Sequence, residues 1–449
     1  MYPILICPQK IKLQPDVSRL YIEKQNKIFS QPINESAVSI LSLCNGKNGV
    51  QDIINQLIKK YHEKEEKVSN FVKDFLNKSA TFGTITWLNS PSPADIAIVG
   101  SSEFWTPDII VIEVTHNCPL SCNHCFLNAG KKGIGMELKE LQKICKEIVA
   151  LDVDMIQLTG GEPLIYPGIE EIISYICESN TKLFITTSGM IISSKIYEYL
   201  ALIKNTGGWV QVSLDGLEAT HNNLRGNPSS YSRAVKFITN LISKEVEVQV
   251  ATCVTTESIN EVEDLCKKVK DWGVRVHRIG VVSERGRAKE NEIHSSVEFR
   301  KKVKNIKNNL KEKYSSPNFT ISGFENEIKP EMQRSIKSKN CGAGYRTLKI
   351  SPDYNIHPCP MINLPLDNLK NTTLADFIKK NNHSFARLES PSEKYCMNCS
   401  NFPLCKGCMT EALLYRERVE KCKWFEKSQI KERLNGTFQA LEEIKLKGV

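Results

Sequence analysis

The 449-residue sequence has no apolar run near the roughly 20 residues that a membrane-spanning helix needs. Its first residues also lack the basic start and long apolar core of a secretory signal peptide. The 60 Lys and Arg residues are scattered among 51 Asp and Glu residues and form no basic block, and the formal net charge is +9. We therefore predict a cytoplasmic globular protein that binds neither a membrane nor nucleic acid.

Cysteine, in contrast, is plentiful. The sequence holds 16 cysteines, and in a reducing compartment such thiols serve metal binding or catalysis rather than a disulfide framework. Ten of them fall into clusters. The other six stand singly in apolar stretches and are predicted to be packing residues: Cys7, Cys44, Cys145, Cys177, Cys253 and Cys266.

Residues 1–90 are predicted to form a separate winged-helix domain. Short extended runs precede three helical patterns, and a strand at 83–88 closes the unit. Asn34 can cap the first helix, and no helix has the basic face expected for DNA recognition. Prolines then predict an extended linker over residues 91–107.

Residues 108–314 alternate strands with helices, which is typical of a parallel α/β fold. Strands are expected at 109–115, 154–158, 182–187, 209–214, 246–254 and 274–280. Since a closed barrel needs two more strands, the pattern favours an open, partial (β/α)6 barrel that resembles a TIM barrel. Its site would lie at the carboxyl ends of the strands.

The remainder of the chain differs from the barrel. Residues 315–427 have few long periodic segments but many cysteines, so bound metal is expected to replace a core there. Residues 428–449 predict a charged C-terminal helix.

Three cysteines follow the first strand of the barrel in the pattern C-x3-C-x2-C: Cys118, Cys122 and Cys125. Three thiols in one loop leave one corner of a metal site open, as in an iron–sulfur cluster with one free iron; an exposed zinc clip is the alternative. Gly160-Gly161-Glu162-Pro163 follows the second strand. Together the two motifs resemble the radical S-adenosylmethionine (SAM) enzymes.

This resemblance implies that the free iron chelates SAM, whose reductive cleavage gives a 5′-deoxyadenosyl radical. It also implies SAM contacts from the residues His124, Gly160, Gly161, Glu162, Pro163, Ser188, Ser213, Asp215 and Arg225. Two of these roles have alternatives, since Asp215 could cap a turn and Arg225 could form a surface ion pair. No protein general base is apparent in the sequence.

The later cysteines, C-x2-C-x5-C-x2-C with three more around them, resemble the SPASM domain, which carries auxiliary [4Fe–4S] clusters. The resemblance implies an outer set of Cys396, Cys399, Cys405 and Cys422 and an inner set of Cys341, Cys359 and Cys408. With the first cluster this makes three [4Fe–4S] clusters; paired zinc sites are the alternative.

The inner set departs from the SPASM pattern. Thr347 stands where the family often has a further cysteine, Tyr354 replaces an expected glycine, and the last internal gap is two residues instead of three. The missing ligand predicts an open iron that a substrate thiolate, Asp353 or water could fill.

Residues 1–90 resemble, in their order of elements, the RiPP recognition element, which binds the leader of a ribosomally made precursor peptide as an added strand. Leu20–Lys27 is the expected docking edge, and a purely structural appendage is the alternative. The whole layout resembles the sactipeptide-forming maturases of the subtilosin-maturase type. That resemblance implies a precursor peptide as partner, an electron donor such as flavodoxin or ferredoxin, and a thioether crosslink from a cysteine sulfur to carbon.

Other functions remain open at this point. The same machinery could form a carbon–carbon crosslink or a formylglycine. A zinc-dependent peptide-binding protein without catalysis is the alternative from another class.

Overall fold

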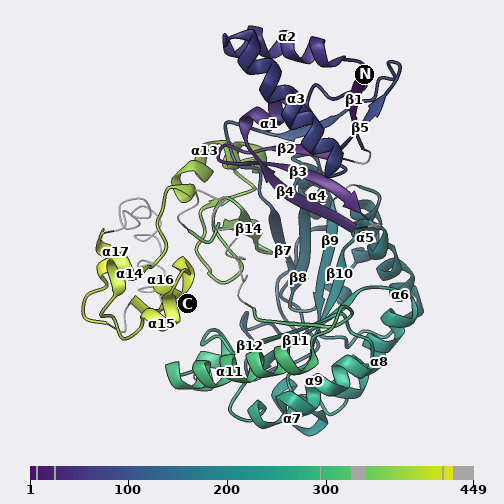
Figure 1. Ribbon diagram of the computed structural model, residues 1–449. Helices are drawn as coiled ribbons and strands as arrows, with labels where there is room; N and C mark the ends of the chain where they lie inside the picture. Colours follow the sequence, from purple (N-terminus) through teal and green to yellow (C-terminus); the bar gives the residue numbers. More distant parts are fainter. Residues whose placement is uncertain are drawn as a thin grey trace. The chain divides into compact units, whose positions relative to one another are not determined.

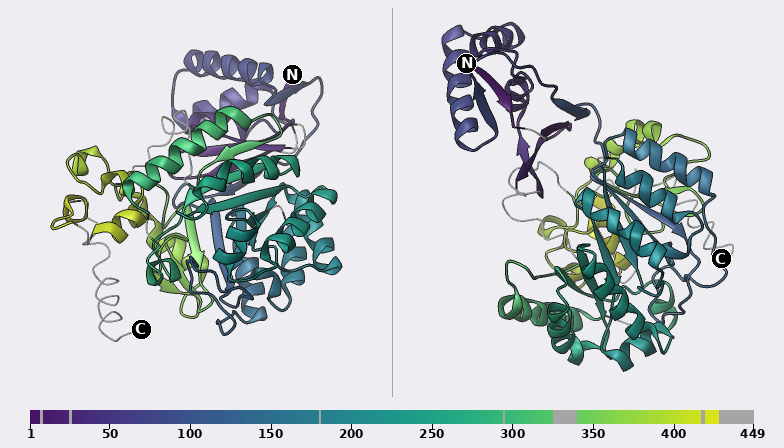
Figure 2. Two further views of the ribbon diagram at one scale, coloured as in Figure 1. Left: turned by 90° about the horizontal axis from the view of Figure 1, so that it is seen from below. Right: turned by 90° about the vertical axis from the view of Figure 1, so that its right-hand side faces the viewer.

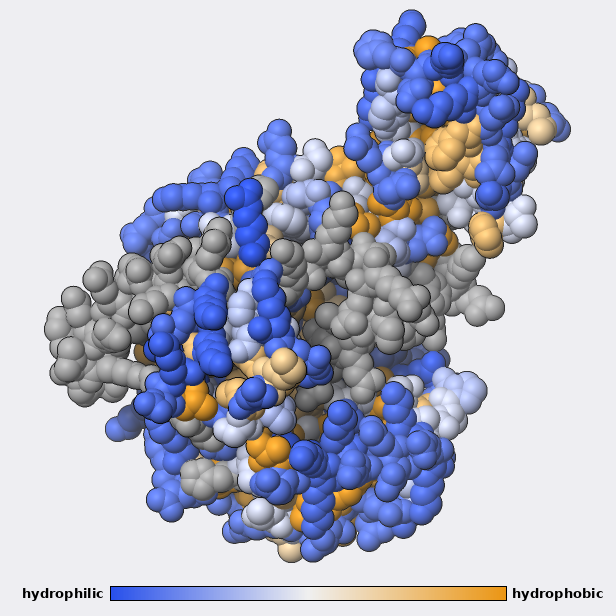
Figure 3. Space-filling view, turned by 60° about the vertical axis from the view of Figure 1, so that its left-hand side comes forward, coloured by the Kyte–Doolittle hydropathy of each residue, from blue (hydrophilic) through white to orange (hydrophobic). Residues whose placement is uncertain are grey.

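The computed structural model describes residues 1–6, 9–24, 27–179, 181–293, 295–324, 340–416 and 419–427. The chain divides into two compact units, one spanning Met1–Thr106 and one that begins at Pro107. No helix in the described parts of the chain has the length and apolarity to cross a bilayer. On the face drawn in Figure 3, hydrophilic residues predominate and apolar patches interrupt them.

The first unit combines two small sheets with three helices (Figure 1). Strand β1 (Tyr2–Leu5) pairs with β5 (Ile85–Leu88), and the second sheet has the order β4 (Lys27–Ile33), β3 (Ser18–Lys24), β2 (Gln9–Leu13) and β6 (Ala97–Gly100). The helices are α1 (Glu35–Leu41), α2 (Val50–Tyr61) and α3 (Glu65–Thr81). Asn34 caps α1 as predicted, because its side chain accepts a 2.8 Å hydrogen bond from the Ala37 amide.

Two details of this unit differ from the prediction. Strand β3 lies between β2 and β4, so the docking edge expected at Leu20–Lys27 is wrong for Leu20–Lys24, whereas Lys27 begins β4, the outer strand. The sequence did not predict β4, which contains Pro32. Proline is tolerated there because β4 is an edge strand. Strand β6 lies inside the predicted linker and pairs in parallel with β2.

The second unit is built on a ten-stranded sheet with the order β13-β12-β11-β10-β9-β8-β7-β14-β15-β16. The six predicted strands are confirmed as a parallel run: β7 (Ile109–Thr115), β8 (Met155–Gly160), β9 (Lys182–Thr187), β10 (Trp209–Ser213), β11 (Val248–Val254) and β12 (Val276–Val281). The end strands β13 and β16 do not pair with each other among the described residues. The sheet is therefore open, as expected for a partial barrel.

Four short strands extend the prediction. They are β13 (Thr320–Ser322), β14 (Thr347–Ile350), β15 (Asn355–His357) and β16 (Asp367–Asn368). Strand β13 is parallel to β12 and β14 is parallel to β7, whereas β15 and β16 run antiparallel to their neighbours. Segments of two to four residues carry too little alternation to be found from sequence.

Amphipathic helices cover the outer face of the sheet (Figures 1 and 2). In α5 (Ile169–Cys177), four isoleucines at helical spacing are buried, and in β8 the buried Ile156 and Leu158 alternate with less buried side chains. The other helices are α4 (Leu138–Ala150), η1 (Pro163–Ile165), α6 (Ser194–Ala201), η2 (Leu202–Thr206), α7 (Glu218–Arg225), α8 (Ser230–Ser243), η3 (Ile259–Glu261), α9 (Val262–Asp271), α10 (Arg287–Glu290) and α11 (Val297–Tyr314).

The cysteine-rich end of the chain consists of short helices: α13 (Leu374–Ala386), α14 (Glu393–Cys396), α15 (Phe402–Cys405), α16 (Met409–Tyr415) and α17 (Lys423–Lys427). It has a small apolar core of its own around the fully buried Trp424 and Tyr415, in which several of its cysteines take part. The expectation that metal alone replaces a core was therefore too strong. The predicted helix over residues 428–449 lies outside the described residues.

Candidate active site

The first cysteine loop continues directly from β7 and is anchored by backbone hydrogen bonds. The Cys118 amide donates to the Gly130 carbonyl at 2.9 Å, and the Asn123 amide donates to the Leu224 carbonyl at 2.9 Å. Burial above all raises the pKa of the Cys118 thiol to about 12, and the neighbouring Cys122 and Cys125 thiols add to the rise. The structure thus brings the three predicted ligands together.

A second loop, which follows β12, holds this cysteine loop in place. Arg287 donates through Nε to the Cys122 carbonyl at 2.7 Å and through a terminal nitrogen to the Ala129 carbonyl at 2.8 Å. A Cβ atom at Gly286 would stand 2.3 Å from the Cys125 carbonyl oxygen, so only glycine allows the two backbones to approach this closely. Sequence reasoning missed these residues, because no motif links them to the cysteines.

The Gly-Gly-Glu-Pro motif docks on the backbone at the start of the cysteine loop. The Gly161 amide donates to the Thr115 carbonyl at 2.7 Å, and the Glu162 amide donates to the Asn117 carbonyl at 2.9 Å. A Cβ atom at Gly160 would lie 2.1 Å from the Thr115 oxygen. The glycines therefore permit a close approach to the protein's own backbone; their predicted contact with SAM stays a prediction.

Glu162 is fully buried and its carboxylate is surrounded by donors. It accepts hydrogen bonds from the Thr187 hydroxyl at 2.7 Å, the Ser188 amide at 2.9 Å and the Ser188 hydroxyl. Its side chain also accepts from the Leu164 amide at the start of η1, where Pro163 stands. The structure thus joins Glu162, Pro163 and Ser188, which the sequence assigned to one site, and adds Thr187.

A buried ion pair lies beside the cysteines. Asp215, which is fully buried, accepts from Arg225 Nε at 2.7 Å and lies 2.6 Å from a terminal nitrogen of Arg225 and 3.1 Å from His124 Nε2. Burial alone would raise the pKa of Asp215, but the Arg225 guanidinium and His124 outweigh it and hold that pKa far below its ordinary value. A terminal nitrogen of Arg225 also reaches the Cys122 sulfur at 3.8 Å.

This geometry decides both alternatives for the pair. Because the Arg225 side chain is only 12% exposed, a surface ion pair is wrong. Asp215 accepts from the Cys253 amide on the neighbouring strand at 3.0 Å, so it does not simply cap a turn.

Cys253 is the site residue that sequence reasoning misjudged. It was expected to be a packing cysteine, but its thiol lies close to Asp215, Arg225 and Cys122, and burial above all raises its pKa to about 12. The strand register could have indicated this, since Ser213 at the end of β10 pairs with Ala251, two residues before Cys253. Among the other single cysteines, Cys44, Cys145 and Cys266 are buried and Cys177 is half-buried, while Cys7 lies outside the described residues.

The outer set gathers around one small cavity, which Cys396, Cys399, Cys405 and Cys422 line together with Tyr415 and Trp424. Burial above all raises the pKa of Cys405 to about 12, and the other three thiols add to the rise. The four sulfurs therefore lie close enough to influence one another.

The inner set meets where α16 begins. Burial raises the pKa of Cys408 to about 12, with a further contribution from Cys341. Burial likewise raises the pKa of Cys359, while the Thr410 hydroxyl, 3.3 Å from its sulfur, and Arg285 act in the opposite direction. Asp353, the alternative fourth ligand, is hydrogen-bonded to Ser351 and Asn355.

Each of the three cysteine sets offers only thiols as donors. In the parts of the chain that the structure describes, no three His, Cys, Asp or Glu side chains converge as the ligands of one metal ion do. The all-thiol donor sets agree with iron–sulfur clusters.

The comparisons with known proteins agree with the motifs. Residues 112–269 match the Radical SAM superfamily, and residues 22–83 match the family described as Coenzyme PQQ synthesis protein D (PqqD). The chain therefore contains a radical SAM domain, which follows a PqqD-like domain in the sequence. The cofactors of this superfamily are a [4Fe–4S] cluster and SAM.

Similar proteins extend this assignment over most of the chain. The antilisterial bacteriocin subtilosin biosynthesis protein AlbA of Bacillus subtilis is 25% identical over 410 residues, which cover 89% of each protein. The sporulation killing factor maturation protein SkfB of the same organism is 26% identical over 316 residues, covering 70% of this chain and 74% of SkfB. The crystal structure of Streptococcus suis SuiB bound to S-adenosylmethionine is similar with a TM-score of 0.64 at 16% identity, covering 94% of this chain and 98% of SuiB. At that identity the likeness confirms the fold alone.

Proposed function

We propose that this enzyme forms thioether crosslinks, from a cysteine sulfur to carbon, in a ribosomally made precursor peptide. The observation that carries the proposal is the union of a PqqD-like domain and a radical SAM domain in one chain, aligned over 89% of its length with a protein of subtilosin biosynthesis. SuiB, which shares the fold, has been crystallised with its precursor peptide SuiA.

In this proposal Cys118, Cys122 and Cys125 hold the [4Fe–4S] cluster to which SAM binds, and together these groups supply a carbon radical when bound. Asp215 holds the positively charged guanidinium of Arg225 beside the Cys122 sulfur. The Glu162 carboxylate accepts a hydrogen bond from the Ser188 amide, so the polar groups of these two residues are already fixed in position. His124, Gly160, Gly161, Pro163 and Ser213 complete the SAM site, as the sequence predicts.

The inner and outer sets each hold an auxiliary cluster, and the closeness of the thiols within each set supports this. The crosslink removes two hydrogens from the peptide. One would leave carbon as a hydrogen atom, taken up by the radical that bound SAM would supply. The other would leave the thiol as a proton, and clusters held by the inner and outer cysteine sets would accept the electron that remains when the carbon–sulfur bond forms. A flavodoxin or ferredoxin supplies the electron that cleaves SAM.

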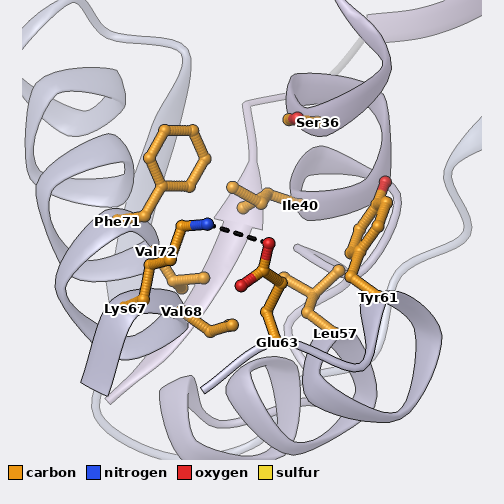
Figure 4. A pocket seen from close by; sticks show the side chains of 9 residues that line it. All are labelled: Ser36, Ile40, Leu57, Tyr61, Glu63, Lys67, Val68, Phe71 and Val72. Atoms are coloured by element: carbon orange, nitrogen blue, oxygen red, sulfur yellow. Dashed lines mark hydrogen bonds and ion pairs between the residues drawn. The ribbon is translucent and has the colours of Figure 1, made fainter. Parts of the chain in front are cut away.

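The domain of residues 1–90 binds the leader of the precursor. Its outer strand β4 offers a free edge in the described part of the sheet, to which a peptide strand can be added. Helices α1, α2 and α3 also surround a cavity, whose apolar lining includes Ile40, Leu57, Val68 and Phe71 (Figure 4). Residues 108–314 act as the radical SAM barrel and 315–427 as the SPASM region, while the predicted linker of residues 91–107 contributes β6 to the sheet of the first unit.

The proposal is tested by incubating reconstituted enzyme, SAM and reductant with the cysteine-containing precursor encoded beside its gene. Mass spectrometry should find two hydrogens lost per crosslink. A variant with Cys118, Cys122 and Cys125 all changed to Ala should leave the mass unchanged. An unchanged mass with the wild-type enzyme would count against the proposal.

The alternatives give different results in the same assay. A precursor with Cys→Ala changes should still lose hydrogens if the enzyme forms carbon–carbon bonds or oxidises a serine to formylglycine. Formylglycine made from a cysteine would instead be recognised by the loss of its sulfur. A zinc-binding protein would be colourless and free of iron. The alignment with AlbA, which covers 89% of this chain, favours none of these.

A further inference from the structure

The loop after β12 connects the two regions that bear cysteines. Its backbone lies against the first cysteine loop, since the Arg287 amide donates to the Cys125 carbonyl at 2.9 Å. The side chain of Arg285, two residues earlier, packs its guanidinium 5.5 Å from the ring centre of Phe126, the residue after Cys125. Glu411, whose carboxylate lies 3.8 Å from this guanidinium, donates its backbone amide to the Cys408 sulfur at 3.5 Å, and the preceding Thr410 lies 3.3 Å from the Cys359 sulfur. Arg285 therefore lies beside the inner set.

Arg285 has no hydrogen-bond acceptor among the described residues. Its Nε and both terminal nitrogens are buried from solvent and unpartnered. The nearest carboxylate oxygen, of Glu411, is 3.8 Å away, beyond hydrogen-bonding distance. A buried guanidinium with five unused donor hydrogens is costly unless an anion meets it.

Glu411 does not meet this need, because it is shared. A terminal nitrogen of Arg300 lies 3.8 Å from the other Glu411 oxygen, which is itself buried without a hydrogen-bond partner. Arg300 has further partners, since it donates to the Tyr415 hydroxyl at 2.8 Å and to the Ser295 hydroxyl at 3.1 Å. Two guanidiniums thus face one carboxylate, and Arg285 is the one without acceptors.

We propose that Arg285 binds the cysteine thiolate of the precursor peptide and directs it to the inner set of cysteines. The site between Phe126, Glu411 and Cys359 then takes one small anion with an excess of positive charge around it. This inference rests on the proposed function, which requires a substrate sulfur close to both the radical and an auxiliary cluster.

The chemistry of this place favours a thiolate. Free cysteine thiols are mostly protonated at neutral pH, and a neighbouring cation lowers their pKa and stabilises the nucleophilic form. The inner set has three cysteines where a closed cluster needs four, so an incoming sulfur has a position to fill. Arginine cannot give up its proton here, so it acts only by charge and hydrogen bonding.

The test compares two precursors on four forms of the reconstituted holoenzyme. Dissociation constants are measured with SAM but no reductant, for the native precursor and for one with its cysteines changed to Ala. The wild-type enzyme should prefer the native precursor. In Arg285→Gln that preference should fall by about 30-fold, the size expected for removing one partner of a buried charge pair, while the Cys→Ala precursor binds as before.

Arg285→Lys keeps the charge but not the planar fork, so its preference should lie between those of the wild type and Arg285→Gln. If Arg285→Gln loses its iron, the precursor preference of Arg285→Lys is compared with that of the wild type instead. The matched control is Arg275→Gln. Arg275 directly precedes β12, at the end of the strand opposite to Arg285, and donates a hydrogen bond to the exposed Asn318. This control should keep the full preference.

An equal preference in the wild type and both Arg285 variants would overturn the assignment, as would an equal loss of affinity for both precursors. Failure of the proposed function is distinguishable, because the wild-type enzyme would then leave the mass of the native precursor unchanged.

Discussion

The two regions that bear cysteine sets are built in opposite ways. The first cysteine loop continues from a strand of the parallel sheet, and residues from three other segments, Gly130, Leu224 and Arg287, hydrogen-bond to its backbone. The outer set instead lies on and between helices of four or five residues, such as α14, α15 and α17. Helices of this length are not stable alone. The barrel positions its cysteines, whereas at the other end of the chain we predict that bound metal would help a small apolar core to hold the short helices together.

The largest expected effect concerns this dependence on metal. Changing Cys396 and Cys422 to Ser should open residues 390–427 to trypsin at Lys394 and Lys406, because bound metal contributes on the order of 10 kcal/mol to small metal-dependent folds. Limited proteolysis followed by mass spectrometry measures this. The control is the variant with Cys118, Cys122 and Cys125 changed to Ser, which should lose SAM cleavage but keep its resistance to trypsin. Equal protection in both variants would contradict the comparison.

An intermediate effect is expected within the barrel, where charge rather than metal is decisive. Arg225→Met should destabilise the second unit by about 3–5 kcal/mol, because it leaves the fully buried Asp215 without its main partner. Urea unfolding followed by circular dichroism measures the loss. Lys195→Met, which removes an exposed ion pair with Glu170, is the control and should cause no measurable change.

The Asp215–Arg225 pair also predicts that the free energy of unfolding depends on pH in the acid range. Since the folded-state pKa of Asp215 lies below its unfolded value, the pair stabilises the protein above the unfolded pKa, and this stability is lost as the pH falls toward the folded pKa. A stability difference between wild type and Arg225→Met that stays constant through the acid range would contradict the pairing.

The smallest effect comes from His277, which is fully buried in β12 and lies 2.8 Å from the Thr252 hydroxyl. Burial lowers the pKa of His277 from 6.5 to about 3. Between pH 6.5 and about 3 the unfolded state therefore binds a proton that the folded state excludes. The free energy of unfolding is fully retained above pH 6.5 and should fall by up to about 1.4 kcal/mol per pH unit as the pH drops through this range. The difference in unfolding free energy between wild type and His277→Leu, measured from pH 7 to pH 4, should show this slope. A flat difference would be evidence against it.

The sequence predicted the frame of the barrel well, because six strands of five to seven residues carry clear alternation and are separated by amphipathic helices. The short spacing of Cys118, Cys122 and Cys125 also placed these three in one loop, whereas the inner and outer sets were assigned by the resemblance to the SPASM domain. The sequence did not predict β13 or β14, whose three or four residues are fixed only by pairing with β12 and β7.

Contacts between distant segments were also beyond sequence reasoning. Nothing near Arg285 or Arg287 indicates that this loop packs on Cys125, 160 positions earlier, and only the fold joins them. Another case is the buried Lys349 in β14, which lies 3.2 Å from Glu113 in β7, where His116 lies 3.0 Å from the other oxygen. Single charged residues in short strands are ordinarily read as exposed.

The pairing of β14 with β7 has a consequence for electron transfer. Strand β7 leads into Cys118, and Cys341 and Cys359 flank the hairpin of β14 and β15, so both cysteine-bearing segments are fastened to one hydrogen-bonded sheet. The gap across which an electron must tunnel between the proposed clusters is then set by backbone geometry. Motion of peripheral loops should leave that tunnelling rate nearly constant through a catalytic cycle.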